Sequence, residues 1–186
     1  MVSLTSLWLP IVLAAVIVFL ASWVLHMLLT YHRADYKKLP GEAETLAEMR
    51  KFDPPPGYYM FPHCESHKDM ANPEVQEKFR TGPVGVVTVF PKGMPQMGKY
   101  LGTWFVFTLL VSLFAGYLAS RTLPATTHYL AVFRVVGASA FLAYGLGELP
   151  SSIWKGQPWA NTFRTMFDGL VYALLTAGTF GWLWPR

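Results

Sequence analysis

The sequence has little charge and a single cysteine. Charged residues make up 14% of its 186 residues, whereas hydrophobic residues make up 53% and aromatic residues 16%. This composition is too apolar for an ordinary soluble domain of this length, and it indicates a chain that lies in lipid. The lone Cys64 excludes a disulfide within the chain.

Catalytic signatures are also missing. The chain has no P-loop, HExxH, GxSxG or glycine-rich dinucleotide motif, and no convincing internal repeat. Its apolar segments carry no Asp, Glu or His near their middle, where an ion-coupled transporter would need one. These absences favour a protein that is neither an enzyme nor an ion-coupled transporter.

Four apolar segments can each cross a hydrocarbon core of about 30 Å, which requires roughly 20 helical residues. They cover approximately residues 7–30, 101–120, 129–147 and 169–184. A lone span must satisfy its own backbone hydrogen bonds, so these segments are expected to be helices. The first has basic residues after it and none before it, which favours a retained anchor over a secretory signal. The predicted fold is an all-α membrane protein with four transmembrane helices.

The placement of charge predicts the orientation. Of fifteen basic residues, ten lie between Arg33 and Lys99, and Lys155 and Arg164 lie between the third and fourth spans. Short cytoplasmic loops collect Lys and Arg, so these segments are predicted to be cytoplasmic and both termini to lie outside, in the periplasm. The predicted regions are a first transmembrane helix (1–32), a cytoplasmic segment (33–99) and a three-helix transmembrane region (100–186).

The cytoplasmic segment of roughly 70 residues is expected to be mostly irregular. The stretch PGEAETLAEMRKF, residues 40–52, predicts a short amphipathic helix that three prolines then stop. Asn72 followed by Pro73 predicts the start of a second helix. Residues 84–90 are typical of a strand, but no partner strand is evident. We therefore expect this segment to pack on the membrane surface or against another protein.

Nucleic acid is not an expected partner, although the net charge is +4. The cytoplasmic segment has nine acidic residues against ten basic ones, so it is nearly neutral and its charges are mixed. The basic residues that follow the first span are explained by orientation and by contact with anionic headgroups.

The segment YYMFPHCESHKDM, residues 58–70, gathers potential metal ligands. The candidates are Met60, His63, Cys64, His67 and Met70. Imidazole, thiolate and thioether groups suit a soft ion such as Cu or Zn. The second cysteine of a typical structural zinc site is missing, however. The segment is thus either a metal site or a loop that packs its aromatic residues, and the spacing favours the loop.

Haem held between two histidines of one chain is not expected. His26 lies near the inner end of the first span and His128 at the outer start of the third. These positions are on opposite faces of the bilayer, so the two side chains cannot share one haem. A single axial ligand, or a ligand shared with another subunit, stays open.

Two features of the spans bear on partners. Arg134 lies within the third span, where it either snorkels to the outer headgroups or contacts another group. The fourth span repeats small residues at every fourth position, namely Gly169, Ala173, Ala177 and Gly181. Such stripes let helices approach closely. They either seal the bundle or form a docking face.

The loop before the fourth span is expected to be an ordered interfacial element. Its interfacial residues are Trp154, Trp159, Arg164 and Asp168. Tryptophan prefers the headgroup region. Asn161 is the predicted N-cap of the helix that follows, and Arg164 and Asp168 are predicted to pair on one helical face.

Three stretches, YMFPH, GPVGVVTVFPKG and SSIWKGQPWANTFRTMFDGLVYALLTAGTFGWLWP, resemble a family of short bacterial integral membrane proteins of unassigned function. The resemblance runs over most of the chain. It implies a bacterial inner-membrane protein with four helices, and it supplies no activity and no catalytic residue.

The leading functional hypothesis is a non-catalytic accessory or stabilising subunit of a larger bacterial membrane complex, with an energy-transducing complex as one candidate. Its expected partners are the lipid bilayer and other membrane subunits or further copies of the chain. The alternative is a metal-binding or redox-linked membrane protein that uses the Met60 to Met70 cluster, with Cu or Zn as the ion. No other cofactor is predicted.

Overall fold

The computed structural model describes residues 2–186, which form two compact units. The helical unit consists of the residues up to Tyr36 together with Gln96–Arg186. The second unit consists of Lys37–Pro95, and we call it the extramembrane unit after the sequence-based expectation for these residues.

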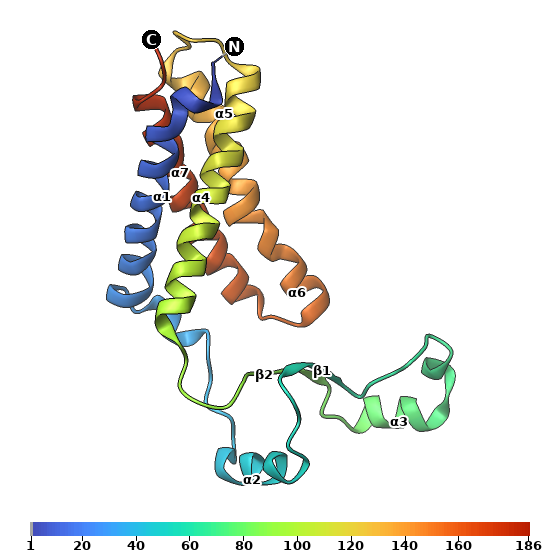
Figure 1. Cartoon of the computed structure of the whole chain (residues 1–186). Coiled ribbons are helices and arrows are strands. Elements are labelled where there is room, and N and C mark those ends of the chain that lie inside the picture. Colours follow the sequence, from blue (N-terminus) through green and yellow to red (C-terminus); the bar gives the residue numbers. More distant parts are fainter. Residues whose placement is uncertain (1) are drawn as a thin grey trace. The chain divides into compact units, whose positions relative to one another are not determined.

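The helical unit is a bundle of four long helices and one short one (Figure 1). Its helices are α1 (Trp8–Trp23), α4 (Met97–Thr122), α5 (Tyr129–Tyr144), α6 (Leu149–Lys155) and α7 (Trp159–Trp182). Single 3-10 turns cover Leu4–Leu7, Tyr31–Ala34 and Leu146–Glu148, and a π-helical turn, Val24–Leu28, extends α1. The start of α1 and the end of α7 lie at the same end of the bundle.

Three helical segments are long and apolar enough to cross a membrane: Leu4–Leu28, Met97–Thr122 and Tyr129–Lys155. The expectation of a mostly helical protein with helices that can cross a membrane is confirmed. The first turns of α7 contain polar and charged residues, and α7 is not among the three segments.

The bundle core consists of small and apolar side chains. α5 packs along α7, and α1 packs against both α4 and α7. Close approach of α5 and α7 depends on glycine: a Cβ atom on Gly169 would lie 2.6 Å from the backbone of Tyr144, and one on Gly181 would lie 2.7 Å from the ring of Tyr129. Ala173 and Ala177 are buried. The small-residue stripe of α7 therefore faces inward in this chain and is not a free docking face.

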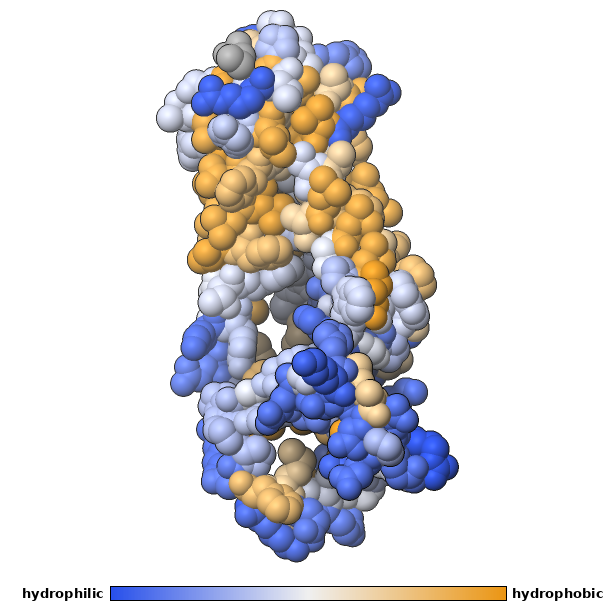
Figure 2. Space-filling model, turned by 90° about the vertical axis from the view of Figure 1, so that its right-hand side faces the viewer, coloured by the Kyte–Doolittle hydropathy of each residue, from blue (hydrophilic) through white to orange (hydrophobic). Residues whose placement is uncertain are grey.

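The face of the bundle shown in Figure 2 is mostly hydrophobic between its two ends. Exposed apolar side chains occur on every long helix, for example Leu20, Phe114, Leu142 and Leu174. Lipid tails offer such side chains the apolar surroundings that water does not, so this surface fits a bundle embedded in a bilayer.

The extramembrane unit contains α2 (Glu42–Phe52), β1 (Gly57–Phe61), a 3-10 turn (Asp69–Ala71), α3 (Pro73–Thr81) and β2 (Gly85–Val89). Both predicted helices are present, and the side chain of Asn72 caps α3 by accepting a hydrogen bond from the backbone of Glu74 at 2.9 Å. β1 and β2 pair antiparallel, with Gly57 opposite Val89. The expectation of an unpaired strand was wrong, because alternation in the short GYYMF stretch is too weak to mark β1.

Candidate metal centre

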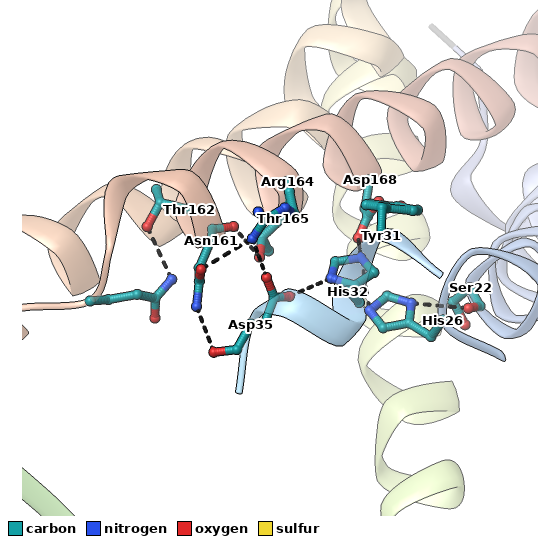
Figure 3. A network of polar contacts seen from close by, with 11 residues as sticks. Ser22, His26, Tyr31, His32, Asp35, Asn161, Thr162, Arg164, Thr165 and Asp168 are labelled. Carbon is teal, nitrogen blue, oxygen red and sulfur yellow. Dashed lines mark hydrogen bonds and ion pairs between the residues drawn. The ribbon is translucent and has the colours of Figure 1, made fainter. Parts of the chain in front are cut away.

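A cluster of polar side chains lies at the end of the bundle where α1 ends (Figure 3). The chain leaves α1 through the π-helical turn, and Leu29 is extended, which ends the helix. The 3-10 turn that follows then lies against the first half of α7. This brings residues from the beginning of the chain against residues more than a hundred positions later.

Asp168 on α7 is the centre of this cluster. Its side chain is only 2% exposed. The Tyr31 hydroxyl donates a hydrogen bond to Oδ1, and His32 Nε2 lies 2.7 Å from Oδ2. His26 Nε2 lies 3.8 Å from the same Oδ2 atom, which is too long for a hydrogen bond.

The other nitrogen of each histidine has its own partner. His26 Nδ1 lies 3.0 Å from the carbonyl oxygen of Ser22, and His32 Nδ1 lies 2.6 Å from Asp35 Oδ2. Both partners accept hydrogen bonds, so each Nδ1 carries the proton. Asp168 is also an acceptor, so the 2.7 Å contact of His32 Nε2 requires a further proton, on that nitrogen or on Asp168. In its neutral form, His26 presents the lone pair of Nε2 toward Asp168 at 3.8 Å.

Asp35 links the cluster to the beginning of α7. Its Oδ1 accepts a hydrogen bond from Arg164 Nη1 at 2.5 Å, and its backbone carbonyl accepts one from Asn161 Nδ2 at 3.0 Å. The predicted pair of Arg164 with Asp168 is therefore wrong, because Asp35 arrives from the first segment and takes the guanidinium. The predicted cap is wrong as well: α7 begins at Trp159, and Asn161 lies inside the helix.

Two groups of the cluster outside the apolar segments titrate abnormally. Burial alone would raise the pKa of the Asp35 carboxyl, but hydrogen bonds from His32 and Arg164 outweigh it and lower that pKa. Burial, together with the hydrogen bond to Asp168, raises the pKa of the Tyr31 phenol. Tyr31 therefore remains protonated and keeps donating to Asp168.

Within residues 2–186, one group of three or more His, Cys, Asp or Glu residues has its ligand atoms within 4.8 Å of one another, and it is His26, His32 and Asp168. Two imidazoles and a carboxylate are a common ligand set for transition metal ions. The ring planes of the two histidines are stacked, with centroids 4.3 Å apart and 9° between the planes.

The ligand atoms of the metal site considered from the sequence do not come together as those of His26, His32 and Asp168 do. Met60, His63, Cys64, His67 and Met70 all line one hollow of about 420 Å³ in the extramembrane unit. His63, Cys64 and His67 do not form a group of ligand atoms within 4.8 Å in the described chain. The two histidines lie in a loop rather than on a shared helical face.

The remaining predicted residues lie apart from this cluster. Arg134 is exposed on the outside of α5, so its side chain does not enter the bundle. Trp154 on α6 is exposed, and Trp159 at the start of α7 stacks near Phe163 with ring centroids 5.8 Å apart. His128 caps α5, accepting a hydrogen bond from the backbone of Leu130 at 3.3 Å.

Sequence reasoning missed Tyr31, His32 and Asp35 as site residues. They follow the first span directly. In the sequence, Tyr31 fits an interfacial aromatic belt, and His32 and Asp35 fit a basic stretch that flanks the membrane, so neither pattern marks a site. The available signal was topological: the end of the first span and the start of the last lie at the same membrane face. Polar residues that flank those two ends are therefore candidates for contact.

Comparisons with protein-family models, with curated proteins and with solved structures give no match. The functional assignment therefore comes from the residues and geometry of this chain.

Proposed function

We propose that this chain is a non-catalytic, multi-pass membrane protein that serves as an accessory or stabilising subunit of a larger bacterial membrane complex. One observation carries the proposal: no residue of the extramembrane unit, Lys37–Pro95, is buried. A segment with helices and strands but without a core needs another surface to bury its apolar side chains.

The unit exposes large apolar residues throughout. Phe52 is 81% exposed, Phe90 is 68% exposed and Met94 is 90% exposed. A two-stranded hairpin is at best marginally stable in water, and the two short helices of the unit add no buried side chain. Hydrophobic burial is the main favourable term in folding, so the unit gains its stability from a contact that supplies that burial.

Charge favours a protein partner over the membrane surface. Segments that bind anionic headgroups carry an excess of Lys and Arg. Residues 33–99 instead combine ten basic with nine acidic residues. Exposed apolar side chains among balanced charges are suited to a protein interface with an apolar centre and a polar rim.

The proposal includes four membrane spans. α7 is the fourth, both chain ends are periplasmic, and residues 33–99 are cytoplasmic. The start of α1 and the end of α7 lie at the same end of the bundle (Figure 1), which supports an even number of crossings. The basic residues between Arg33 and Lys99 support the cytoplasmic assignment.

Cysteine labelling tests this topology. Single cysteines are introduced near Val2 and near Lys92 in a Cys64→Ser background. An impermeant reagent applied to intact cells should label the first position and not the second. Labelling in the reverse pattern would overturn the orientation, and labelling of both would overturn the membrane placement of the extramembrane unit.

Purification in mild detergent tests the role as a subunit. The tagged wild type should retain a reproducible companion that cross-links to the extramembrane unit, and a Phe52→Ser, Phe90→Ser double variant should lose it. Trp154→Ser is the matched control, because Trp154 is an exposed aromatic residue outside that unit. A wild type that purifies as a monomer without a companion contradicts the proposal. So does a companion that both variants retain equally.

A further inference from the structure

We propose that His26, His32 and Asp168 bind a divalent transition metal ion of the zinc class. The site goes beyond the proposed role as a subunit, because partner binding requires no metal. It is separate from the Met60 to Met70 hollow, and it lies within the helical unit.

The ligand types fit such an ion. Zinc and its neighbours in the first transition row bind neutral imidazole nitrogen together with carboxylate oxygen, and three protein ligands commonly leave one position for water. The carboxylate of Asp168 supplies one negative charge, which suits a divalent ion better than a monovalent one. Thioether and thiolate groups are not part of the cluster, so a soft ion such as Cu(I) is disfavoured.

The ligand atoms are close to the required separation. Ligands of a tetrahedral zinc ion at bond lengths of 2.0–2.2 Å lie roughly 3.4 Å apart. His26 Nε2 is 3.8 Å from Asp168 Oδ2, and His32 Nε2 is 2.7 Å from it. These two separations therefore differ from the required one by less than about 1 Å, with His32 too close to Asp168 and His26 too far from it. The stacked rings must also turn before both nitrogens can face one ion.

The surrounding contacts supply a hydrogen-bond partner for the Nδ1 atom of each ring. Metal-bound histidines usually donate their second N–H to a carbonyl or a carboxylate, which sets the tautomer and the ring direction. Here Ser22 supplies the carbonyl for His26, and Asp35 supplies the carboxylate for His32. The side chain of Ser22 is itself held by Trp104 Nε1 at 2.9 Å.

Charge also favours a cation at this point. Asp168 is buried, and the guanidinium of Arg164, one helical turn away in α7, pairs with Asp35 instead. A buried carboxylate is costly unless a cation and hydrogen bonds compensate it. A protonated His32 could meet that need alone, but it would leave the Nε2 atom of His26 facing Asp168 without a hydrogen bond. A bound metal ion uses both rings.

An ion can reach the site through His26. The side chain of His26 is 49% exposed, whereas that of His32 is 14% exposed. The stacked rings must also tilt, because a metal ion lies in the plane of each imidazole that binds it. His26 is the ring that is freer to turn, since its one hydrogen bond is to the Ser22 carbonyl.

Metal titration of the full-length protein in detergent tests the site. The protein is stripped with a chelator and titrated with Co²⁺, whose visible absorption reports nitrogen and oxygen ligands, and with Zn²⁺ in competition. We expect one equivalent to bind. His26→Ala should weaken binding by more than about 100-fold, because even a residue that only hydrogen-bonds to a metal ligand is worth about 10- to 100-fold.

Two controls keep the outcome interpretable. His128→Ala removes a histidine at the start of α5 and should bind like wild type. The metal-free His26→Ala protein should unfold at the wild-type temperature, because it loses one hydrogen bond at a half-exposed position. Asp168→Asn keeps the shape of the side chain and should also lose metal binding.

Three results would overturn the site. They are a wild type that does not take up one equivalent, a His26→Ala variant that binds as tightly as wild type, and binding that is lost on His63→Ala instead. The purification experiment tests the role as a subunit, and the metal titration tests only the metal site. A negative result in one of them therefore does not count against the other proposal.

Discussion

The helical unit and the extramembrane unit differ in side-chain burial. In the helical unit, Leu7, Val132 and Phe180 are completely buried, and even the charged Asp168 is enclosed. In residues 37–95 no side chain is buried, although helices and strands form there. Local signals are therefore enough to produce secondary structure, but they do not produce a core.

Ion pairs in the two units differ in their exposure and in the sequence separation of their partners. Arg80 with Glu77 and Lys51 with Glu48 are exposed pairs within single helices, three residues apart. Arg164 with Asp35 joins positions 129 residues apart and is partly buried. Exposed pairs contribute little to stability, whereas removing one partner of a buried pair is costly. Electrostatics should therefore matter to the bundle and not to the extramembrane unit.

Hydrogen exchange should show the largest contrast. In the purified protein, amides of β1 and β2 should exchange at least about 1,000-fold faster than those of α5, because opening of a unit without a core costs close to nothing. Mass spectrometry of exchanged peptides measures this. Equal protection of β1 and α5 in the absence of any companion would break the comparison, since it would mean that the extramembrane unit is stable alone.

The contact between α5 and α7 should be the most sensitive part of the bundle. Gly169→Ala places a Cβ atom 2.6 Å from the backbone of Tyr144, which cannot move as a side chain can. We expect a loss of about 3 kcal/mol or more in unfolding free energy. Gly102→Ala in α4 is the control, because nothing lies within 4 Å of its Cβ position. It should be neutral or slightly stabilising, and equal effects of the two changes would contradict the close approach.

The pair of Arg164 with Asp35 should have the next largest effect. Arg164→Ala should destabilise the protein by about 1–2 kcal/mol, because it leaves Asp35 without its guanidinium. Adding Asp35→Asn should recover part of the loss, whereas adding Asp168→Asn should not. Thermal unfolding in detergent measures the series. Rescue by Asp168→Asn alone would show that Arg164 pairs within α7 after all.

The matched changes at exposed charges should have no measurable effect. Lys155→Ala removes a charge from the end of α6, and Arg80→Ala breaks the exposed pair with Glu77. A destabilisation by Arg80→Ala as large as that by Arg164→Ala would remove the electrostatic difference between the two units.

The smallest effect is expected at an apolar residue of the extramembrane unit. Phe90→Ser should change the unfolding free energy of the isolated protein by less than about 0.5 kcal/mol, because surface substitutions away from packed features are nearly neutral. Phe90 directly follows β2 and is largely exposed. A loss comparable to that of a core substitution, measured by chemical unfolding, would reveal a core in residues 37–95.

Hydropathy and short-range signals were sufficient to predict the helical class, the apolar segments that can cross a membrane, and both helices of the extramembrane unit. The cap at Asn72 is an example: the asparagine, the proline after it and the acidic Glu74 act within one helical turn. Such features depend on neighbours in the chain, so they can be inferred from the chain alone.

Long-range pairing could not be inferred in this way. The pairing of β1 with β2 was missed because the short β1 stretch has too little alternation to stand out alone, and a loop and a helix separate it from β2 in the sequence. The cluster around Asp168 was missed because Tyr31, His32 and Asp35 come from the segment after the first span, and that segment meets α7 only when the bundle assembles. Arg164 had a suitable carboxylate one turn away on its own helix. In the folded chain, Tyr31 and His32 contact the buried Asp168, and Arg164 pairs with Asp35 instead. Which carboxylate pairs with Arg164 therefore depends on the side chains that are enclosed when α1 packs against α7.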